Sequence, residues 1–261
     1  MGQFVAGIDI GSATSKVVIL REGKIAATSL IRTGAESAET AQRAMEMAVE
    51  EIGLGLADLD YIVATGYGRI IVPFAHQVIT EIACHAKGIH FVFPQVRTIL
   101  DMGGQDCKAI RVDERGLHTN FAMNDKCAAG TGRFLEAMAR ALDLPIQELG
   151  PLSLQSSESV AVSSMCAVFA KSEVTAMARR GIPKSTILAG LHEAIAERVH
   201  SLLKRVGIEP DFAISGGIAK NVGVVHHVEQ RLGLKAHIAP EPQIMGALGA
   251  ALFGAERVGN S

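Results

Sequence analysis

The sequence has little of what would mark a membrane or nucleic-acid-binding protein. Its 25 lysine and arginine residues are balanced by 27 aspartate and glutamate residues, and they form no cluster that would attract nucleic acid or an anionic membrane. The longest uncharged apolar stretch, residues 244–255, is too short and too rich in glycine and alanine to span a bilayer. Residues 1–4 lead into a strand-like segment without the basic region and cleavage site of a signal peptide. We therefore expect a soluble cytoplasmic protein with no nucleic-acid or membrane partner.

Cysteine is also scarce, with four residues and no Cys-x-x-Cys pair. Disulfides are rare in cytosolic chains, and the missing pair argues against a self-contained zinc site. An isolated cysteine is by default a small buried hydrophobe, so we expect Cys84 in the core or lining a cleft and assign no role to Cys107. Neighbours in a helix point in different directions, which argues against a metal site at Cys84 and His85. We interpret His226–His227 as a solvated turn.

The chain has no Gly-x-x-x-x-Gly-Lys-Ser/Thr motif, which excludes a P-loop. It has instead three glycine-rich turns after buried strands, at residues 9–16, 101–106 and 215–221. Glycine lets backbone N–H groups approach phosphate oxygens, and serine and threonine hydroxyls add donors. Aspartates at the strand ends can hold Mg²⁺ through water. A single glycine-rich turn usually has only a structural role, but three of them together favour a phosphate-binding site.

Two of these turns belong to a weak internal repeat. Asp9, Gly11 and Lys16 recur at one constant offset as the second set Asp101, Gly103 and Lys108. In both copies an apolar run ends in Asp-x-Gly, turns, and resumes, which predicts a β-hairpin with a glycine-rich tip. Repetition at this scale indicates two related halves. We expect domains at 1–96 and 97–261, with a C-terminal helix at about 244–258 packing back on the first.

Hydrophobic residues make up 48% of the chain, which favours a well-packed globular protein. Apolar residues at helical spacing between 39 and 52 predict an amphipathic helix. Similar reasoning predicts further helices at 79–87, 131–142, 170–180, 187–206 and 246–253. Short buried strands are expected at 61–65 and 212–215. Strands alternate with helices, so the predicted fold class is α/β.

The three turns resemble the phosphate-1, phosphate-2 and adenosine elements of the acetate-kinase/sugar-kinase/Hsp70/actin superfamily. More narrowly, residues 65–69, 101–106, 124–134 and 246–252 resemble the BadF/BadG/BcrA/BcrD ATPase family. The string Asn-Asp-Lys-Cys-Ala-Ala-Gly-Thr-Gly at 124–132 is highly specific, and the similarity extends over essentially the whole chain. The family includes activators of 2-hydroxyacyl-CoA dehydratases and ATPase subunits of benzoyl-CoA reductases. The resemblance implies two actin-like (ribonuclease H-like) domains with ATP and Mg²⁺ in the cleft between them.

The resemblance also implies roles for individual positions. Those expected near the terminal phosphates are Gly11, Ser12, Ala13, Thr14, Ser15 and Lys16. Those expected to bind magnesium, partly through water, are Asp9 and Asp101. The second phosphate loop would be Gly103, Gly104 and Gln105, and the next glycines to approach the nucleotide would be Gly130 and Gly132. Bordering the adenosine would be Gly216, Gly217, Ala219 and Gln243. No catalytic base stands out, and the candidates for positioning the attacking water are Gln105 and Asp106.

Cys127 and Cys166 each come at or just before a predicted helix start, where partial positive charge favours the thiolate. A [4Fe–4S] cluster normally takes four thiolates, so one chain with two suitable cysteines supplies half of them. A two-fold homodimer would supply four, provided that the other two cysteines are not ligands. In the family the equivalent pair bridges a cluster between subunits.

The resemblance implies an ATPase coupled to electron transfer. A reduced ferredoxin or flavodoxin would charge the cluster, and ATP hydrolysis would drive the electron to a partner iron–sulfur enzyme. The sequence leaves open whether that partner is a 2-hydroxyacyl-CoA dehydratase, a benzoyl-CoA reductase or a double-cubane-cluster protein. Two other functions on the same fold also stay open, a small-molecule kinase without a cluster and an actin- or Hsp70-like assembly module.

Overall fold

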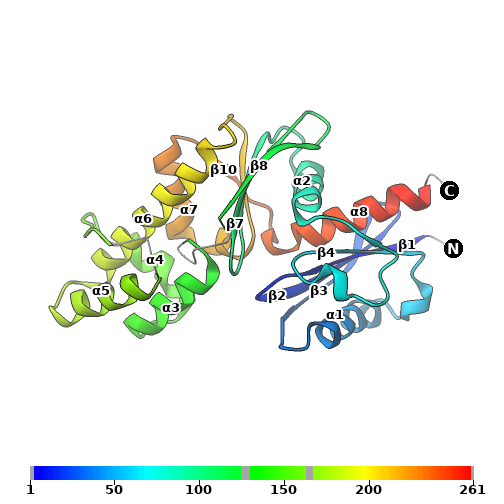
Figure 1. Cartoon of the computed structure of the whole chain (residues 1–261), viewed down its shortest axis with the longest axis horizontal. Helices are drawn as coiled ribbons and strands as arrows, with labels where there is room; N and C mark the ends of the chain where they lie inside the picture. The colour runs from blue at the N-terminus through cyan, green and yellow to red at the C-terminus, as the bar shows by residue number, and fades with distance from the viewer. Residues whose placement is uncertain (1–2, 125–129, 163–166, 260–261) are drawn as a thin grey trace. The chain divides into compact units, whose positions relative to one another are not determined.

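The computed structural model of the 261-residue chain describes residues 3–124, 130–162 and 167–259. Cys127 and Cys166 lie outside the described residues. The chain forms two compact units (Figure 1). Unit 1 consists of Met1–Gln95, Val112–Thr119 and Ala239–Ser261, and unit 2 consists of Val96–Arg111 and Asn120–Ile238.

Unit 1 is built on a five-stranded sheet with strand order β3-β2-β1-β4-β5. Its strands are β1 (Phe4–Ile10), β2 (Thr14–Arg21), β3 (Lys24–Arg32), β4 (Tyr61–Thr65) and β5 (Gln77–Val78). β1 pairs with β2 in antiparallel fashion and with β4 in parallel fashion, so it is the centre of the sheet. The run of buried residues along β1 and β4 fits strands that are covered on both faces.

Helices α1 (Ser37–Glu51) and α8 (Met245–Gly259) pack on this sheet, and α2 (Glu81–Val92) packs mainly on α8. The apolar stripe of α1 packs in one core cluster with Ala6 and Ile8 of β1. Gly7 points to the opposite face, where an added Cβ would lie 2.0 Å from the carbonyl oxygen of Ala247 in α8. α8 also packs along α2 (Figure 1). Small residues therefore bring α8 into backbone contact with the central strand.

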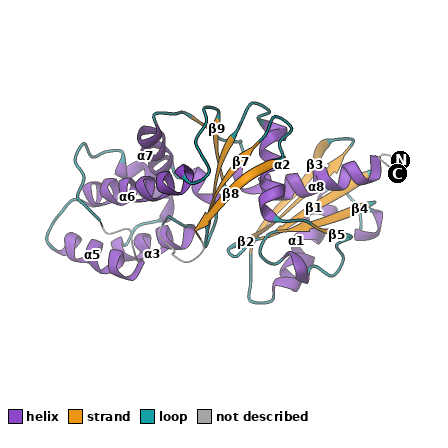
Figure 2. Ribbon diagram, turned by 45° about the horizontal axis from the view of Figure 1, so that its top comes forward, coloured by secondary structure: helices purple, strands orange, loops and turns teal. Residues whose placement is uncertain are grey.

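Unit 2 repeats the five-stranded plan, with strand order β10-β9-β6-β7-β8 (Figure 2). Its strands are β6 (Thr98–Met102), β7 (Cys107–Val112), β8 (His118–Asn124), β9 (Phe212–Ser215) and β10 (Ala236–His237). β6 pairs antiparallel to β7 and parallel to β9. The arrangement around β6 is thus the arrangement around β1 in unit 1.

Helices supply most of the core of unit 2 (Figure 2). They are α3 (Gly132–Leu142), α4 (Leu149–Ser153), α5 (Ala167–Arg179), α6 (Lys184–Lys204) and α7 (Val222–Leu232). Single 3₁₀ turns occur at Leu56–Asp58, Arg69–Ile71, Ile146–Glu148, Gly217–Lys220 and Pro242–Ile244. Among the described residues, no helix combines the length and the apolar character needed to cross a membrane.

The α/β class predicted from the sequence is confirmed, and each predicted helix is found with ends shifted by a few residues. One local interpretation is wrong. His226–His227 is not a solvated turn, because both residues lie within α7 and are partly buried. The Asn221 side chain caps this helix by accepting from the N–H groups of Gly223 and Val224, which fixes its start five residues earlier.

Candidate functional site

The internal repeat in the sequence is a repeat in the structure. In unit 1 the Gly11 N–H donates to the Thr14 carbonyl at 3.1 Å and closes the tip of the β1–β2 hairpin. In unit 2 the Gly103 N–H donates to the Asp106 carbonyl at 2.9 Å and closes the β6–β7 hairpin in the same way. Identical spacing along the chain therefore gives two hairpins with one geometry at the tip.

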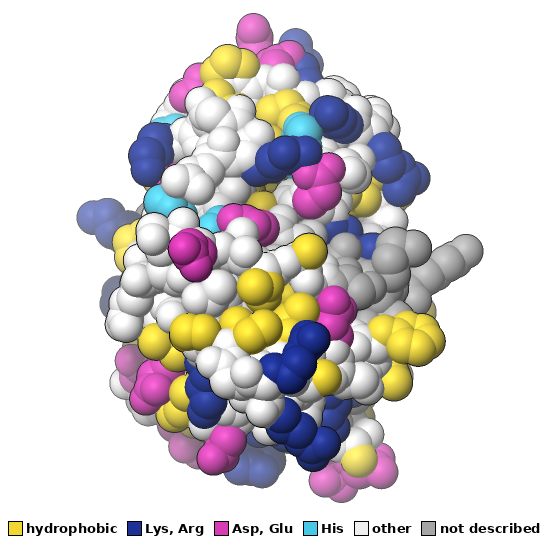
Figure 3. All heavy atoms as spheres, turned by 90° about the vertical axis from the view of Figure 1, so that its left-hand side faces the viewer, with side chains coloured by type: hydrophobic (Ala, Val, Ile, Leu, Met, Phe, Trp, Pro, Cys, Tyr) yellow, Lys and Arg dark blue, Asp and Glu magenta, His cyan; other side chains and the backbone are white. Residues whose placement is uncertain are grey.

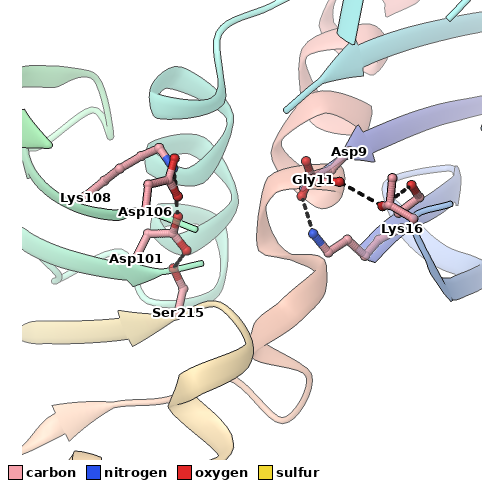
Figure 4. Close-up of polar contacts among 9 residues, drawn as sticks. Asp9, Gly11, Lys16, Asp101, Asp106, Lys108 and Ser215 are labelled. Atoms are coloured by element: carbon pink, nitrogen blue, oxygen red, sulfur yellow. Dashed lines mark hydrogen bonds and ion pairs between the residues drawn. The ribbon is translucent and has the colours of Figure 1, made fainter. Parts of the chain in front are cut away.

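The register places an aspartate opposite a lysine in each hairpin (Figure 4). In unit 1 the Lys16 Nζ lies 3.0 Å from the Asp9 Oδ2, and the Asp9 side chain is almost fully buried. The other carboxylate oxygen, Oδ1 of Asp9, is buried and has no hydrogen-bond partner among the described residues. A buried carboxylate oxygen without a partner is costly, and a hydrated magnesium ion would satisfy it. Asp9 therefore fits the metal role that the sequence predicts for it.

The tip of the first hairpin is held in place by the end of β3. The Thr33 hydroxyl donates to the Gly11 carbonyl at 2.8 Å, and the Thr33 N–H donates to the Ala13 carbonyl at 3.0 Å. Ser15 is buried, with its hydroxyl 2.9 Å from that of Thr33. Of the residues predicted to approach phosphate, those left partly exposed at the tip are Gly11, Ser12, Ala13 and Thr14.

The second hairpin carries two carboxylates around one buried lysine (Figure 4). The Lys108 Nζ lies 2.8 Å from the Asp106 Oδ1 and 3.7 Å from the Asp101 Oδ2, and the Lys108 side chain is 2% exposed. The Ser215 hydroxyl donates to the Asp101 Oδ1 at 3.1 Å. A lysine this deep in a protein is stable only beside compensating charge. Asp106, predicted to position water, therefore has an ion-pairing role in this structure.

A strand that ends in a hydroxyl residue lies beside each hairpin. Thr65 at the end of β4 is opposite Asp9, and Ser215 at the end of β9 is opposite Asp101. The sequence alone places Thr65 in a family motif but does not match it to Ser215. The available signal was a buried strand followed by a hydroxyl residue and a glycine in each half.

The glycine that follows each of these strands packs closely against the carboxylate. Gly66 has φ +87° and Gly216 has φ +83°, a region that side chains other than glycine rarely adopt. A Cβ at Gly66 would lie 2.3 Å from the Asp9 Oδ1, and one at Gly216 would lie 2.9 Å from the Asp101 Oδ1. Both glycines thus pack directly against the carboxylate and the end of the neighbouring strand, where no larger residue would fit.

The predicted adenosine residues fall on two separate stretches of chain. Gly216 and Gly217 form the turn between β9 and a 3₁₀ turn, in which Ala219 is buried and Gly217 is exposed. A Cβ at Gly216 would also lie 2.3 Å from the Met102 carbonyl, so this turn packs directly on the end of β6. Gln243 lies in the 3₁₀ turn before α8, in unit 1, and is partly exposed.

The start of α3 lies against the second phosphate loop. The Gly132 N–H donates to the Gly103 carbonyl at 3.0 Å, and the Arg133 N–H donates to the Gly104 carbonyl at 3.0 Å. The structure therefore brings together two groups of glycines that the sequence predicts near the nucleotide from different segments. The Gln105 amide oxygen, in the preferred orientation of the amide, lies 3.0–3.2 Å from the three nitrogens of the Arg133 guanidinium.

The two described cysteines are buried thiols. Burial raises the pKa of Cys84 to about 12 and also raises the pKa of Cys107. Cys107 donates its Sγ–H to the Gly130 carbonyl at 2.9 Å. Both residues are at most 1% exposed, so neither thiol is accessible at the surface of the chain.

Fold and site together define a class: an α/β protein in which duplicated Asp–Lys hairpins present glycine-rich tips suited to phosphate. The fold is shared with a solved structure of a ROK hexokinase from Thermus thermophilus, with a TM-score of 0.54 and 15% identity, a likeness that concerns the fold alone. It covers 99% of this chain and 100% of that chain.

The chain belongs to the BadF/BadG/BcrA/BcrD ATPase family, whose sequence model matches residues 6–254. It is 48% identical to the activator of lactoyl-CoA dehydratase from Anaerotignum propionicum, over 97% of this chain and 98% of that protein. It is 36% identical to a benzoyl-CoA reductase subunit from Thauera aromatica, over 97% of this chain and 93% of that protein. The solved structure of the 2-hydroxyisocaproyl-CoA dehydratase activator from Clostridium difficile, with bound ADPNP, has a TM-score of 0.94 and 40% identity, and the match covers 99% of this chain and 96% of that chain.

Proposed function

We propose that this protein is an ATPase that drives electron transfer from its own iron–sulfur cluster to a partner iron–sulfur enzyme. The observation that carries the ATPase half of the proposal is the duplicated hairpin. Each copy places an aspartate beside a lysine and packs a glycine directly against the carboxylate. Membership of an ATPase family supports ATP as the ligand of these hairpins.

The aspartates, the glycine-rich tips and the lysine would each have a separate role in phosphate chemistry. Asp9 and Asp101 would hold Mg²⁺ partly through water, and the ion would neutralise charge that develops on the transferred phosphoryl group. Glycine-rich tips would donate backbone N–H groups to phosphate oxygens, and Lys16 would add a positive charge at the first tip. Phosphoryl transfer depends mainly on positioning and charge stabilisation, which these groups supply without a strong catalytic base.

For the cluster we propose Cys127 and Cys166 as ligands, two from each subunit of a homodimer. The proposal is supported by elimination, because Cys84 and Cys107 are buried within one subunit and are not accessible to a second one. A second support is the apolar surface that follows Cys166. Val168 and Phe169 in the first turn of α5 are each 70% exposed.

Exposed hydrophobic surface of this kind suits a subunit interface. Figure 3 shows one face of the molecule on which hydrophobic side chains gather among lysine and arginine side chains.

For the partner enzyme we propose a 2-hydroxyacyl-CoA dehydratase, with reduced ferredoxin or flavodoxin as the electron donor in the cytoplasm. The support is the greater identity to a dehydratase activator, 48%, than to a benzoyl-CoA reductase subunit, 36%. The alternatives are a benzoyl-CoA reductase and a double-cubane-cluster protein. An anaerobic reduction assay with each candidate partner would decide among them.

The test of the ATPase is the substitution Asp101→Asn, assayed for phosphate release in the presence of Mg²⁺. Loss of one carboxylate charge at the metal should lower the rate on the order of 100-fold. Asp113→Asn is the matched control, because Asp113 accepts from the Arg115 and Leu117 N–H groups in an exposed turn and asparagine can accept the same bonds. Equal rates in the Asp101→Asn variant and the wild type would contradict the assigned role.

A further inference from the structure

The first turn of α3 is capped by the phosphate-2 loop, which we define as Gly103–Gln105. A helix start leaves N–H groups without a partner inside the helix. In α3 the N–H groups of Gly132 and Arg133 donate to the carbonyls of Gly103 and Gly104, each at 3.0 Å. Two stretches of chain that are far apart in sequence are therefore joined by paired main-chain hydrogen bonds.

Two side chains strengthen the same junction. Cys107, which follows the loop at the start of β7, donates its Sγ–H to the Gly130 carbonyl at 2.9 Å, and the residue is 1% exposed. The Gln105 amide lies against the Arg133 guanidinium, with all three guanidinium nitrogens 3.0–3.2 Å from the amide oxygen. The buried contact of Cys107 with Gly130 lies just before the start of α3, and the exposed contact of Gln105 with Arg133 lies at the second residue of the helix. The junction is therefore held on both sides of the helix start.

We propose that Cys107 and Arg133 are positioning residues that make the phosphate-2 loop and the start of α3 move as one body. The inference rests on the proposed function, since it concerns a nucleotide phosphate bound at Gly103 and Gly104. A tip held only by its own hairpin could rearrange around a diphosphate or a triphosphate without consequence. With these contacts, a displacement of the tip carries the N-terminus of α3 with it, because packed and bonded interiors do not deform independently.

The alternative is that these contacts only stabilise the fold. Arg133 separates the two possibilities, because it is exposed and a single exposed contact to an amide adds little to stability. Substitution of Arg133 should therefore leave the melting temperature unchanged while it changes how α3 responds to the nucleotide. Cys107→Ser keeps a hydroxyl donor at the buried position, so it should restore what Cys107→Ala removes.

The experiment is hydrogen–deuterium exchange on the full-length protein, purified without oxygen and compared with Mg·ADP and with Mg·ADPNP bound. In the wild type, changing the nucleotide should alter exchange on the order of tenfold in peptides over both 99–106 and 130–142. Arg133→Gln and Cys107→Ala should keep the response of 99–106 and lose most of the response of 130–142. Arg140→Gln, an exposed position one heptad further along α3, is the matched control and should behave as the wild type does.

Two outcomes would overturn the proposal. One is a full response of 130–142 in both Arg133→Gln and Cys107→Ala. The other is a wild-type protein in which 99–106 responds and 130–142 does not. A fluorescent ATP analogue that fails to bind the wild-type protein would instead overturn the proposed function, and this inference with it, so the two failures are told apart by the binding titration.

Discussion

Lys16 and Lys108 occupy the same register position in the two hairpins but differ in their surroundings. Lys16 is 12% exposed and faces one aspartate, whereas Lys108 is 2% exposed and lies between Asp101 and Asp106. The repeat in the sequence predicted the two hairpins, but it did not predict that the aspartate and the lysine of each hairpin pair with one another. It could not predict that Asp106 turns inward to the lysine, because that depends on the packing around the finished tip.

Removal of the buried Lys108 should lower the free energy of unfolding more than removal of Lys16 does. Lys108→Met leaves two carboxylates around an apolar side chain, and breaking a buried ion pair in this way costs about 3 kcal/mol. Lys16→Met, with one aspartate and more solvent, should cost about 1 kcal/mol. Urea denaturation of both variants measures the difference, and equal losses would show that burial of Lys108 has no energetic consequence.

A buried histidine makes stability depend on pH. The His192 Nδ1 lies 2.8 Å from the Ser153 hydroxyl, which itself donates to the Gly150 carbonyl, so the histidine is the donor. The His192 Nε2 is buried without a partner among the described residues, and burial lowers the pKa of His192 to about 3. The helical pattern in the sequence places this histidine on the inward face of a long helix but gives it no partner.

At pH values between the pKa of His192 in the folded state and its ordinary value of 6.5, the folded state binds fewer protons than the unfolded chain. Stability is therefore fully present above about pH 6.5 and falls as the pH decreases below it, by about 1.4 kcal/mol per unit. From pH 7.5 to 5.5 the wild type should lose about 1 kcal/mol more than His192→Asn does, measured by urea denaturation at each pH. Parallel stability curves for the two proteins would refute this assignment.

Helix α8 is held by close backbone contact instead of large side chains. A Cβ at Gly249 would lie 1.8 Å from the Cys84 carbonyl of α2, and a Cβ at Gly88 would lie 2.1 Å from the Met245 carbonyl of α8. The sequence predicted a small-residue helix here. It did not show which glycines are contact points, because glycine and alanine look alike in a hydrophobic pattern and only the partner backbone distinguishes them.

The packing of α8 predicts opposite effects for two glycine substitutions on the same helix. Gly249→Ala must push two helices apart and should destabilise the protein by about 3 kcal/mol. Gly259→Ala, which has no atom of the described residues within 4 Å of the added Cβ, should be neutral or stabilising by about 0.5 kcal/mol. Differential scanning calorimetry of the pair checks this, and a tolerated Gly249→Ala would mean that α8 is not in backbone contact with α2.

The two units share one plan, which the repeat in the sequence indicated and the sheet orders display. β1 and β6 are the central strands, each with an antiparallel partner that forms a phosphate hairpin and a parallel partner that ends in a hydroxyl residue. The parallel partners β4 and β9 were predicted as strands, but their equivalence was not, because their resemblance is carried by only two residues in each half. Patterns of that length occur too often by chance to be noticed without the structure.

Assembly of the whole molecule should depend on the exposed start of α5. Phe169→Glu places a charge in the proposed subunit interface and should convert the dimer to a monomer in light-scattering measurements. Val222→Glu is the control, because Val222 is also a half-exposed hydrophobic residue but begins α7. A dimer that survives Phe169→Glu would exclude this surface from the interface.

The proposed electron-transfer function depends most on two subunits sharing one iron–sulfur cluster. Iron and acid-labile sulfide, measured per dimer after purification without oxygen, test it most directly. A [4Fe–4S] cluster shared by two chains requires about four iron atoms per dimer, and Cys127→Ser and Cys166→Ser should each abolish them. Protein that remains free of iron after anaerobic reconstitution, while it still hydrolyses ATP, would contradict the electron-transfer function and leave only an ATPase.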